Sequence, residues 1–91
     1  MSTATPTITM YSTAICPYCI RAEHFLAAKG VTHIEKIRVD LEPALRVAMV
    51  QRTGRRTVPQ IFIGEVHVGG YEDLVKLDRA GRLGAMLAGG A

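Results

Sequence analysis

Thr7-Ile8-Thr9-Met10-Tyr11 and, after four intervening residues, Cys16-Pro17-Tyr18-Cys19 are the most informative runs of the chain. The first alternates and is rich in β-branched and aromatic residues, which predicts a short strand. The second places a proline where it suits the first position of a helix, because proline has no N–H to leave unpaired there. The following residues, up to a stop at Gly30, share one helical face at Ala22, Phe25, Leu26 and Lys29. We therefore predict a strand at residues 7–11 and a helix over residues 17–29.

The rest of the chain continues this alternation of strands and helices. Residues 33–39 have strand composition, and Leu45, Ala48 and Met49 stand at helical spacing between Pro43 and Gly54. Two strands at 60–63 and 66–68 are joined by Gly64-Glu65, a pair suited to a tight hairpin. A helix follows Gly69-Gly70, with Leu74, Leu77 and Leu83 on its buried side, and a short helical turn closes the chain. The order β-α-β-α-β-β-α predicts an α/β fold with a mixed four-stranded sheet flanked by helices.

Length and composition limit the class of protein. The 91 residues, 48% hydrophobic and 21% charged, predict one domain over 1–91 with frayed ends at 1–6 and 88–91. No run approaches the ~20 apolar residues of a membrane helix, and Met1 to Pro6 lacks the order of a signal peptide, so we expect a cytoplasmic protein that does not bind membranes. The net charge is +3, but only Arg52, Arg55 and Arg56 cluster and aromatic residues are 5%, so we expect no nucleic-acid partner. A pocket for a small anion fits this charge better.

The two cysteines carry the chemistry. They are too few and too close together for the disulfide scaffold of a small secreted protein. If Pro17 is the first helical residue, Cys16 is the N-cap, and its sulfur faces the unpaired N–H groups that stabilise a thiolate. Cys16 is then the attacking thiol, and Cys19, one turn inside, is the resolving thiol. A closed zinc site needs four ligands, and His24, His33 and His67 have no finger-like spacing, so we expect no metal.

Several separate motifs together resemble a dithiol glutaredoxin, most like the bacterial glutaredoxin 3 group. They are Tyr11, Cys16-Pro17-Tyr18-Cys19, Thr57-Val58-Pro59-Gln60-Ile61-Phe62-Ile63, Gly69-Gly70 and Asp73-Leu74. The resemblance extends from about Ile8 to Leu83. It implies a thioredoxin-like fold and an enzyme that reduces protein disulfides and glutathione mixed disulfides. We expect that enzyme to be a monomer. Glutathione is the implied co-substrate, with no permanently bound cofactor.

The resemblance also implies a set of glutathione-binding residues. They are Thr13, Tyr18, Arg55, Arg56, Thr57, Val58, Pro59, Gly70, Tyr71, Glu72 and Asp73. By the resemblance, Pro59 would be cis and leave the Val58 backbone free to pair with the cysteinyl part of glutathione. Sequence alone favours a proline that opens an edge strand, because few X–Pro bonds are cis. The helix start at Gly70 would bind the γ-glutamyl carboxylate, and Asp73 would take the α-ammonium or simply cap the helix.

Thr13 stands where many family members have a lysine that contacts the glycine carboxylate of glutathione. Arg55 or Arg56 could replace that lysine, or could form a solvated basic loop. Tyr18 and Tyr71 fit either the pocket rim or ordinary packing, and His67, in mid-strand, fits a structural role.

Two other functions share this fold. A thioredoxin-like reductase served by a flavoprotein would not need the carboxylate and amine pocket that Gly69-Gly70 and Asp73 suggest. A [2Fe–2S] carrier would join two chains through Cys16 and two glutathiones, and Pro17 is unfavourable there because cluster-binding relatives tend to have a small residue at that position.

Overall fold

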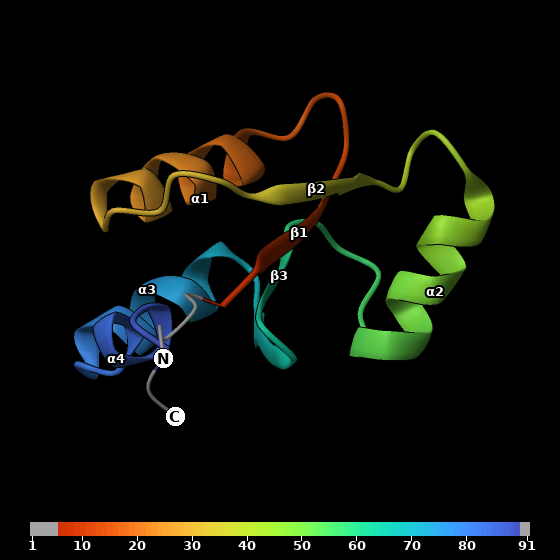
Figure 1. Ribbon diagram of the computed structural model, residues 1–91. Coiled ribbons are helices and arrows are strands. Elements are labelled where there is room, and N and C mark those ends of the chain that lie inside the picture. The colour runs from red at the N-terminus through yellow and green to blue at the C-terminus, as the bar shows by residue number, and fades with distance from the viewer. Residues whose placement is uncertain (1–5, 90–91) are drawn as a thin grey trace.

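The computed structural model describes residues 6–89 and arranges them around a central sheet (Figure 1). The elements are β1 (Ile8–Ser12), α1 (Pro17–Ala28), β2 (Glu35–Arg38), α2 (Pro43–Thr53), β3 (Gln60–Ile63), β4 (Val66–Gly69), α3 (Tyr71–Arg79) and α4 (Leu83–Leu87). No helix within the described range is long and apolar enough to cross a membrane. Of the frayed ends expected at 1–6 and 88–91, residues 1–5 and 90–91 lie outside the described range, so that expectation stays a prediction.

The sheet has the strand order β2-β1-β3-β4. β1 pairs parallel with β2 and antiparallel with β3, and β3 pairs antiparallel with β4. All four residues of β3 are buried, as expected for a strand covered on both faces. The predicted mixed four-stranded sheet flanked by helices is confirmed.

Helices cover both faces of this sheet: α1, α3 and α4 lie on one side and α2 on the other (Figure 1). The alternation along β3 separates two cores, because Ile61 and Ile63 join the α1 side while Phe62 packs with Met49 of α2. Val58, in the loop before β3, packs against both cores. The loop that precedes β3 is therefore anchored on both sides of the sheet.

The structure moves some predicted boundaries. β1 lies one residue later than expected because Ser12 still pairs, with Arg38 of β2. β2 starts at Glu35 rather than at residue 33, and Ile34 packs against the α1-side core instead. Ala48 is exposed because α2 buries a narrow stripe around Met49. The predicted closing turn is α4.

Two residues expected on buried helix faces lie elsewhere. Lys29 is exposed and pairs with Asp78, its ammonium 5.5 Å from the centre of the Phe25 ring. Leu83 is buried, but it opens α4 instead of continuing α3. Gly64 adopts a positive φ of 59° in the turn between β3 and β4, which confirms the tight hairpin.

Candidate functional site

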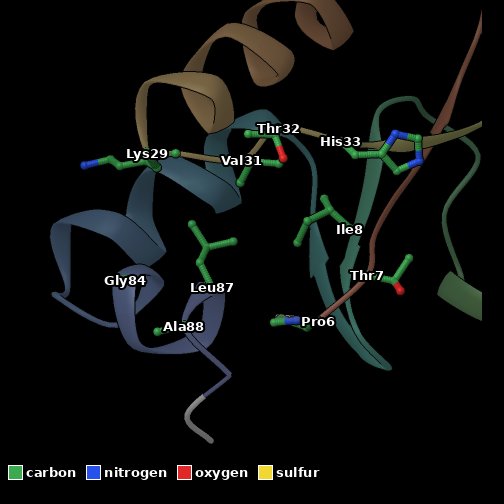
Figure 2. Close-up of a pocket in the computed structure, with 11 residues that line it drawn as sticks. Pro6, Thr7, Ile8, Lys29, Val31, Thr32, His33, Gly84, Leu87 and Ala88 are labelled. Carbon is green, nitrogen blue, oxygen red and sulfur yellow. The ribbon is translucent and has the colours of Figure 1, made fainter. Parts of the chain in front are cut away.

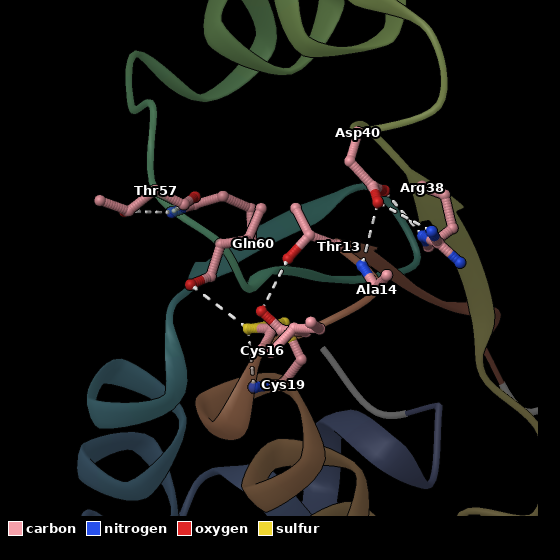
Figure 3. The surroundings of a disulfide bond; sticks show 10 residues. Thr13, Ala14, Cys16, Cys19, Arg38, Asp40, Thr57 and Gln60 are labelled. Atoms are coloured by element: carbon pink, nitrogen blue, oxygen red, sulfur yellow. Dashed lines mark hydrogen bonds and ion pairs between the residues drawn. A yellow bond between two sulfur atoms is a disulfide. The ribbon is translucent and has the colours of Figure 1, made fainter.

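Cys16 caps the N-terminus of α1. Its backbone is extended (φ −148°, ψ 94°), and its Sγ accepts the backbone N–H of Cys19 at 3.1 Å (Figure 3). Pro17 is the next residue, so the first helical position has no N–H to satisfy. The geometry is that of an N-cap in which sulfur replaces the usual side-chain oxygen. A negative charge on this sulfur would face the positive end of the helix.

Cys16 and Cys19 form a disulfide in this structure. Both side chains are nearly enclosed, with Cys16 7% and Cys19 3% exposed. The Cys16 Sγ also lies 3.9 Å from the Val58 carbonyl oxygen, which belongs to the loop before β3. The two cysteines therefore sit where the start of α1 meets that loop.

Side chains hold three successive carbonyls of the loop between α2 and β3. Arg55 O lies 3.2 Å from the Thr53 hydroxyl, whose single proton is shared with Met49 O at 2.8 Å. Arg56 O accepts from Arg46 Nη1 at 3.0 Å, and Thr57 O accepts from Gln60 Nε2 at 3.0 Å. Gly54, with φ 74°, ends α2 and starts the loop. The loop is thus fixed by the protein's own polar groups.

Val58 stands apart from these neighbours in the loop. Within residues 6–89 its N–H has no hydrogen-bond partner, and its carbonyl oxygen has only the Cys16 sulfur nearby. The Val58–Pro59 peptide is cis, as the resemblance implies. Within the described part of the chain, the peptide groups of Val58 are therefore without a backbone partner, and its carbonyl oxygen lies beside the Cys16 sulfur.

The N-terminus of α3 lies against this loop. The Asp73 carboxylate accepts the Gly70 N–H at 2.9 Å and the Arg55 Nη1 at 2.8 Å. A Cβ added to Gly70 would lie 3.5 Å from the Pro59 carbonyl oxygen, and Gly69, with φ 114°, leaves no room for a side chain beside Asp73. Glycine is therefore needed at position 69, whereas at Gly70, whose φ is −88°, an added Cβ would make only an ordinary van der Waals contact with the loop.

Arg55 and Asp73, two of the predicted site residues, form an ion pair at the start of α3. The Arg55 guanidinium and the Gly70 N–H lower the pKa of the Asp73 carboxyl below its usual value. Arg55 is therefore paired with a protein carboxylate in this structure. The Arg56 guanidinium has no ion-pair or hydrogen-bond partner among the described residues.

Arg46 is a residue that sequence reasoning missed. It reaches from α2 to the Arg56 carbonyl and so brings another guanidinium to the loop. It also lines a surface groove of about 560 Å³ together with Arg56. No sequence signal singled it out, because it stands ten residues from Arg56 on an exposed helical face.

Phe25 and Tyr71 pack against the core that contains both cysteines. Tyr18 is half exposed, and its ring centre lies 6.2 Å from that of Tyr71 and 5.3 Å from the Arg21 guanidinium. Tyr71 also contacts Phe25 edge-on at 6.2 Å. The structure thus gives Tyr71 a packing role and leaves part of Tyr18 open to solvent. Glu72 is exposed in the first turn of α3.

The loop between β1 and Cys16 has its own anchor. The Thr13 hydroxyl donates to Ile15 O at 3.3 Å, and the Ala14 N–H donates to Asp40 at 3.2 Å (Figure 3). Arg38 binds the same Asp40 carboxylate through two nitrogens, at 2.7 and 2.8 Å, and lowers its pKa far below the usual range. Among residues 6–89, Thr13 makes no hydrogen bond to another of the predicted site residues.

One cavity lies away from these residues. It has a volume of about 500 Å³ and is bounded by the end of α1, the start of β1 and α4, and none of the predicted site residues lines it (Figure 2). Over residues 6–89, no three His, Cys, Asp or Glu side chains gather in a way that could hold a metal ion.

Comparisons with known proteins identify the family. The family model described as Glutaredoxin matches residues 8–68. The chain belongs to the glutaredoxin family. It is 52% identical to a protein named Glutaredoxin from Neisseria meningitidis over 81 residues, covering 89% of this chain and 95% of that protein. It is 44% identical to Glutaredoxin 3 of Escherichia coli over 80 residues, covering 88% of this chain and 95% of that protein.

Solved glutaredoxin structures share the fold. The solution structure of glutaredoxin from Brucella melitensis superposes with a TM-score of 0.82 at 44% identity, covering 96% of this chain and 94% of that one. A buckwheat glutaredoxin–glutathione complex gives a TM-score of 0.82 at 34% identity, covering 90% of this chain and 76% of that one. The thioredoxin-like fold is thereby confirmed. The family and the Cys-X-X-Cys pair together identify this glutaredoxin as a glutathione-related thiol oxidoreductase.

Proposed function

We propose that this glutaredoxin uses glutathione to reduce glutathione mixed disulfides and protein disulfides. The observation that carries the proposal is the position of Cys16 Sγ, at the start of α1 and 3.9 Å from the open Val58 peptide. That arrangement offers a stabilised thiolate next to backbone groups that can align a peptide-like substrate. The buckwheat relative solved with glutathione supports the choice of ligand.

In the first route the Cys16 thiolate attacks the glutathione sulfur of a mixed disulfide. A bond forms between Cys16 and the glutathione sulfur, and the target leaves as a thiolate that takes a proton from water. The thiolate of a second glutathione then attacks the bound glutathione sulfur. Oxidised glutathione leaves, and the Cys16 thiolate is restored. Only one protein cysteine takes part in this cycle.

In the second route Cys16 attacks a disulfide within a protein and forms a mixed disulfide with it. The Cys19 thiolate then attacks the Cys16 sulfur, which releases the target as a dithiol and leaves the Cys16–Cys19 disulfide. Two glutathione molecules reduce that disulfide. The short Cα–Cα distance of 5.2 Å between the cysteines suits this internal step.

Glutathione is bound by the unpaired backbone groups and the charged side chains of the site. The Val58 N–H and C=O pair with the cysteinyl backbone in strand fashion, and the γ-glutamyl carboxylate meets the backbone N–H groups at the start of α3. Asp73 takes the α-ammonium through Oδ1, while Arg55 keeps its present ion pair with Oδ2. Arg56, whose guanidinium is free within the described range, is then the better candidate for the glycine carboxylate.

The remaining predicted site residues surround the bound glutathione. Tyr18 and Tyr71 form the rim, Thr57 and Pro59 shape the loop, and Glu72 and Thr13 border the two ends of the bound tripeptide. The protein acts as a cytoplasmic monomer on glutathione and on glutathionylated or disulfide-bonded proteins. This compartment keeps glutathione reduced, and thiol pairs there are commonly catalytic rather than structural.

A coupled assay tests the proposal. NADPH oxidation is followed in the presence of glutathione, glutathione reductase and a small glutathione mixed disulfide, and in parallel with a thioredoxin-type flavoprotein reductase in place of glutathione and its reductase. The expected result is turnover in the first arm alone. Turnover only with the flavoprotein would refute the proposal, as would a visible cluster absorption with no turnover in the first arm.

A further inference from the structure

Gln60 is a fully buried polar residue next to the proposed glutathione site. Its side chain is 0% exposed at the first position of β3, directly after Pro59. Burying an amide is unfavourable unless its donors and acceptor find partners. Gln60 has them: its Nε2 donates to Thr57 O at 3.0 Å and to Thr57 Oγ1 at 3.3 Å, while its Oε1 lies 2.8 Å from His67 Nε2.

These contacts fix which way the amide points. A carbonyl oxygen only accepts, so the Gln60 nitrogen must face Thr57 and its oxygen must face His67. His67 therefore donates from Nε2. Burial, together with the charges of Arg55 and Arg52, lowers the pKa of His67 despite the opposing charge of Asp73, so the neutral ring carries its proton on Nε2.

The His67 ring is itself held by packing. It lies against Phe62 with ring centres 5.0 Å apart, and the Arg52 guanidinium lies 3.8 Å from the centre of the Phe62 ring. A side chain on β4 is thereby connected, through Gln60, to the loop that carries Val58. Figure 3 shows Gln60 and Thr57 joined beside the cysteine pair.

The effect on Val58 follows from the geometry of the peptide bond. The Thr57 carbonyl and the Val58 N–H belong to one planar unit and point in opposite directions. A hydrogen bond that holds the Thr57 oxygen toward Gln60 therefore directs the Val58 N–H away from it. Within residues 6–89 this N–H meets no acceptor.

We infer that His67 and Gln60 are positioning residues that orient the Thr57–Val58 peptide for the cysteinyl backbone of glutathione. The inference rests on the proposed function, since it assigns these residues to the same site. Neither side chain touches the substrate. His67 acts only through Gln60, and Gln60 acts only through the peptide plane.

The variants that test this are Gln60→Met, which keeps length and removes both polar contacts, and His67→Phe, which keeps packing on Phe62 and removes the donor. The matched control is Tyr11→Phe. It removes a hydrogen bond between the sheet and α2, the 3.2 Å bond from Arg52 Nη1 to the Tyr11 hydroxyl, and leaves the hydrogen bond of the Thr57 carbonyl in place.

Three quantities are measured for each variant and for the control: KM for a glutathionylated peptide, the rate of Cys16 alkylation by iodoacetamide, and the Tm. Gln60→Met should raise KM about three- to tenfold, the range expected for one lost hydrogen bond, with the alkylation rate within about twofold of wild type. His67→Phe should raise KM less, and the double variant should match Gln60→Met, because the two residues act in series. Tyr11→Phe should lower Tm without changing KM.

The Val58 amide gives a readout that does not depend on turnover. In the reduced protein without glutathione, its ¹H–¹⁵N signal should shift and broaden in Gln60→Met and in His67→Phe, and stay sharp in Tyr11→Phe.

An unchanged KM and amide signal in both variants would overturn the inference. So would additive effects in the double variant, or a KM change that Tyr11→Phe reproduces. If Gln60→Met fails to fold, His67→Phe decides the result. Absence of wild-type turnover with glutathione, together with these amide changes, would refute the proposed function and leave the positioning intact.

Discussion

Cys19→Ser leaves Cys16 as the chain's single thiol, and we expect that thiol to react as a thiolate well below the pH at which a free cysteine does. The serine keeps the backbone N–H that the Cys16 sulfur accepts at 3.1 Å. A hydrogen bond to a charged acceptor contributes about 1.5–3 kcal/mol, and a helix N-terminus adds about 0.3–1 kcal/mol. The near-complete enclosure of Cys16 opposes part of this gain by disfavouring the charge.

At 1.36 kcal/mol for each pH unit, a net gain of about 2–3 kcal/mol moves the titration midpoint from about 8.5 to between about 6 and 7. The assay is the initial rate of alkylation by iodoacetamide across this range of pH. The control is the same variant unfolded in urea, in which the helix start is lost. A folded midpoint equal to the unfolded one would refute activation of Cys16 by the start of α1.

The other predictions concern the charged and glycine positions of the site. Arg56→Ala should raise the KM for a glutathione mixed disulfide about two- to fivefold, the effect of an exposed ion pair, whereas a larger change in Arg55→Ala would reverse their assignment. Gly69→Ala should destabilise the fold by about 1–3 kcal/mol in urea unfolding, because φ is 114° and the new Cβ meets the Asp73 carboxylate; unchanged stability would contradict this. The pKa of Asp73 is lowered in the folded protein, so its stabilising effect is present above the unfolded value of about 3.9 and is lost as pH falls through the folded value. Urea unfolding from neutral to strongly acidic pH should therefore show a smaller acid loss in Asp73→Asn than in wild type, and parallel curves would refute this contribution.

Local signals in the sequence predicted the cysteine geometry well. The N-cap role of Cys16 depends on its neighbours Pro17 and Cys19, so proximity along the chain was enough. The sheet was also predictable, because the alternation of strands and helices has few possible topologies. The boundaries of β2 were less predictable from the sequence. A strand ends where its pairing with the neighbouring strand ends, and tertiary packing determines that point.

Long side chains explain what sequence analysis missed. The pairing of Arg55 with Asp73 spans eighteen residues and depends on how α3 docks against the loop. Gln60 was assigned to a strand and to a family motif but to no contact, because its partner His67 lies across a hairpin with an irregular register. Such contacts need the fold in place before either residue can be assigned a role.

The most direct test of glutathione-dependent exchange is to identify what becomes attached to Cys16. Reduced Cys19→Ser protein is mixed with a glutathionylated peptide, quenched with acid and examined by intact-mass and peptide-mapping mass spectrometry. The account predicts glutathione in disulfide linkage to Cys16 and the peptide released as a free thiol. Peptide linked to Cys16 with glutathione released would contradict it, because the site would then be selecting the protein part of the substrate.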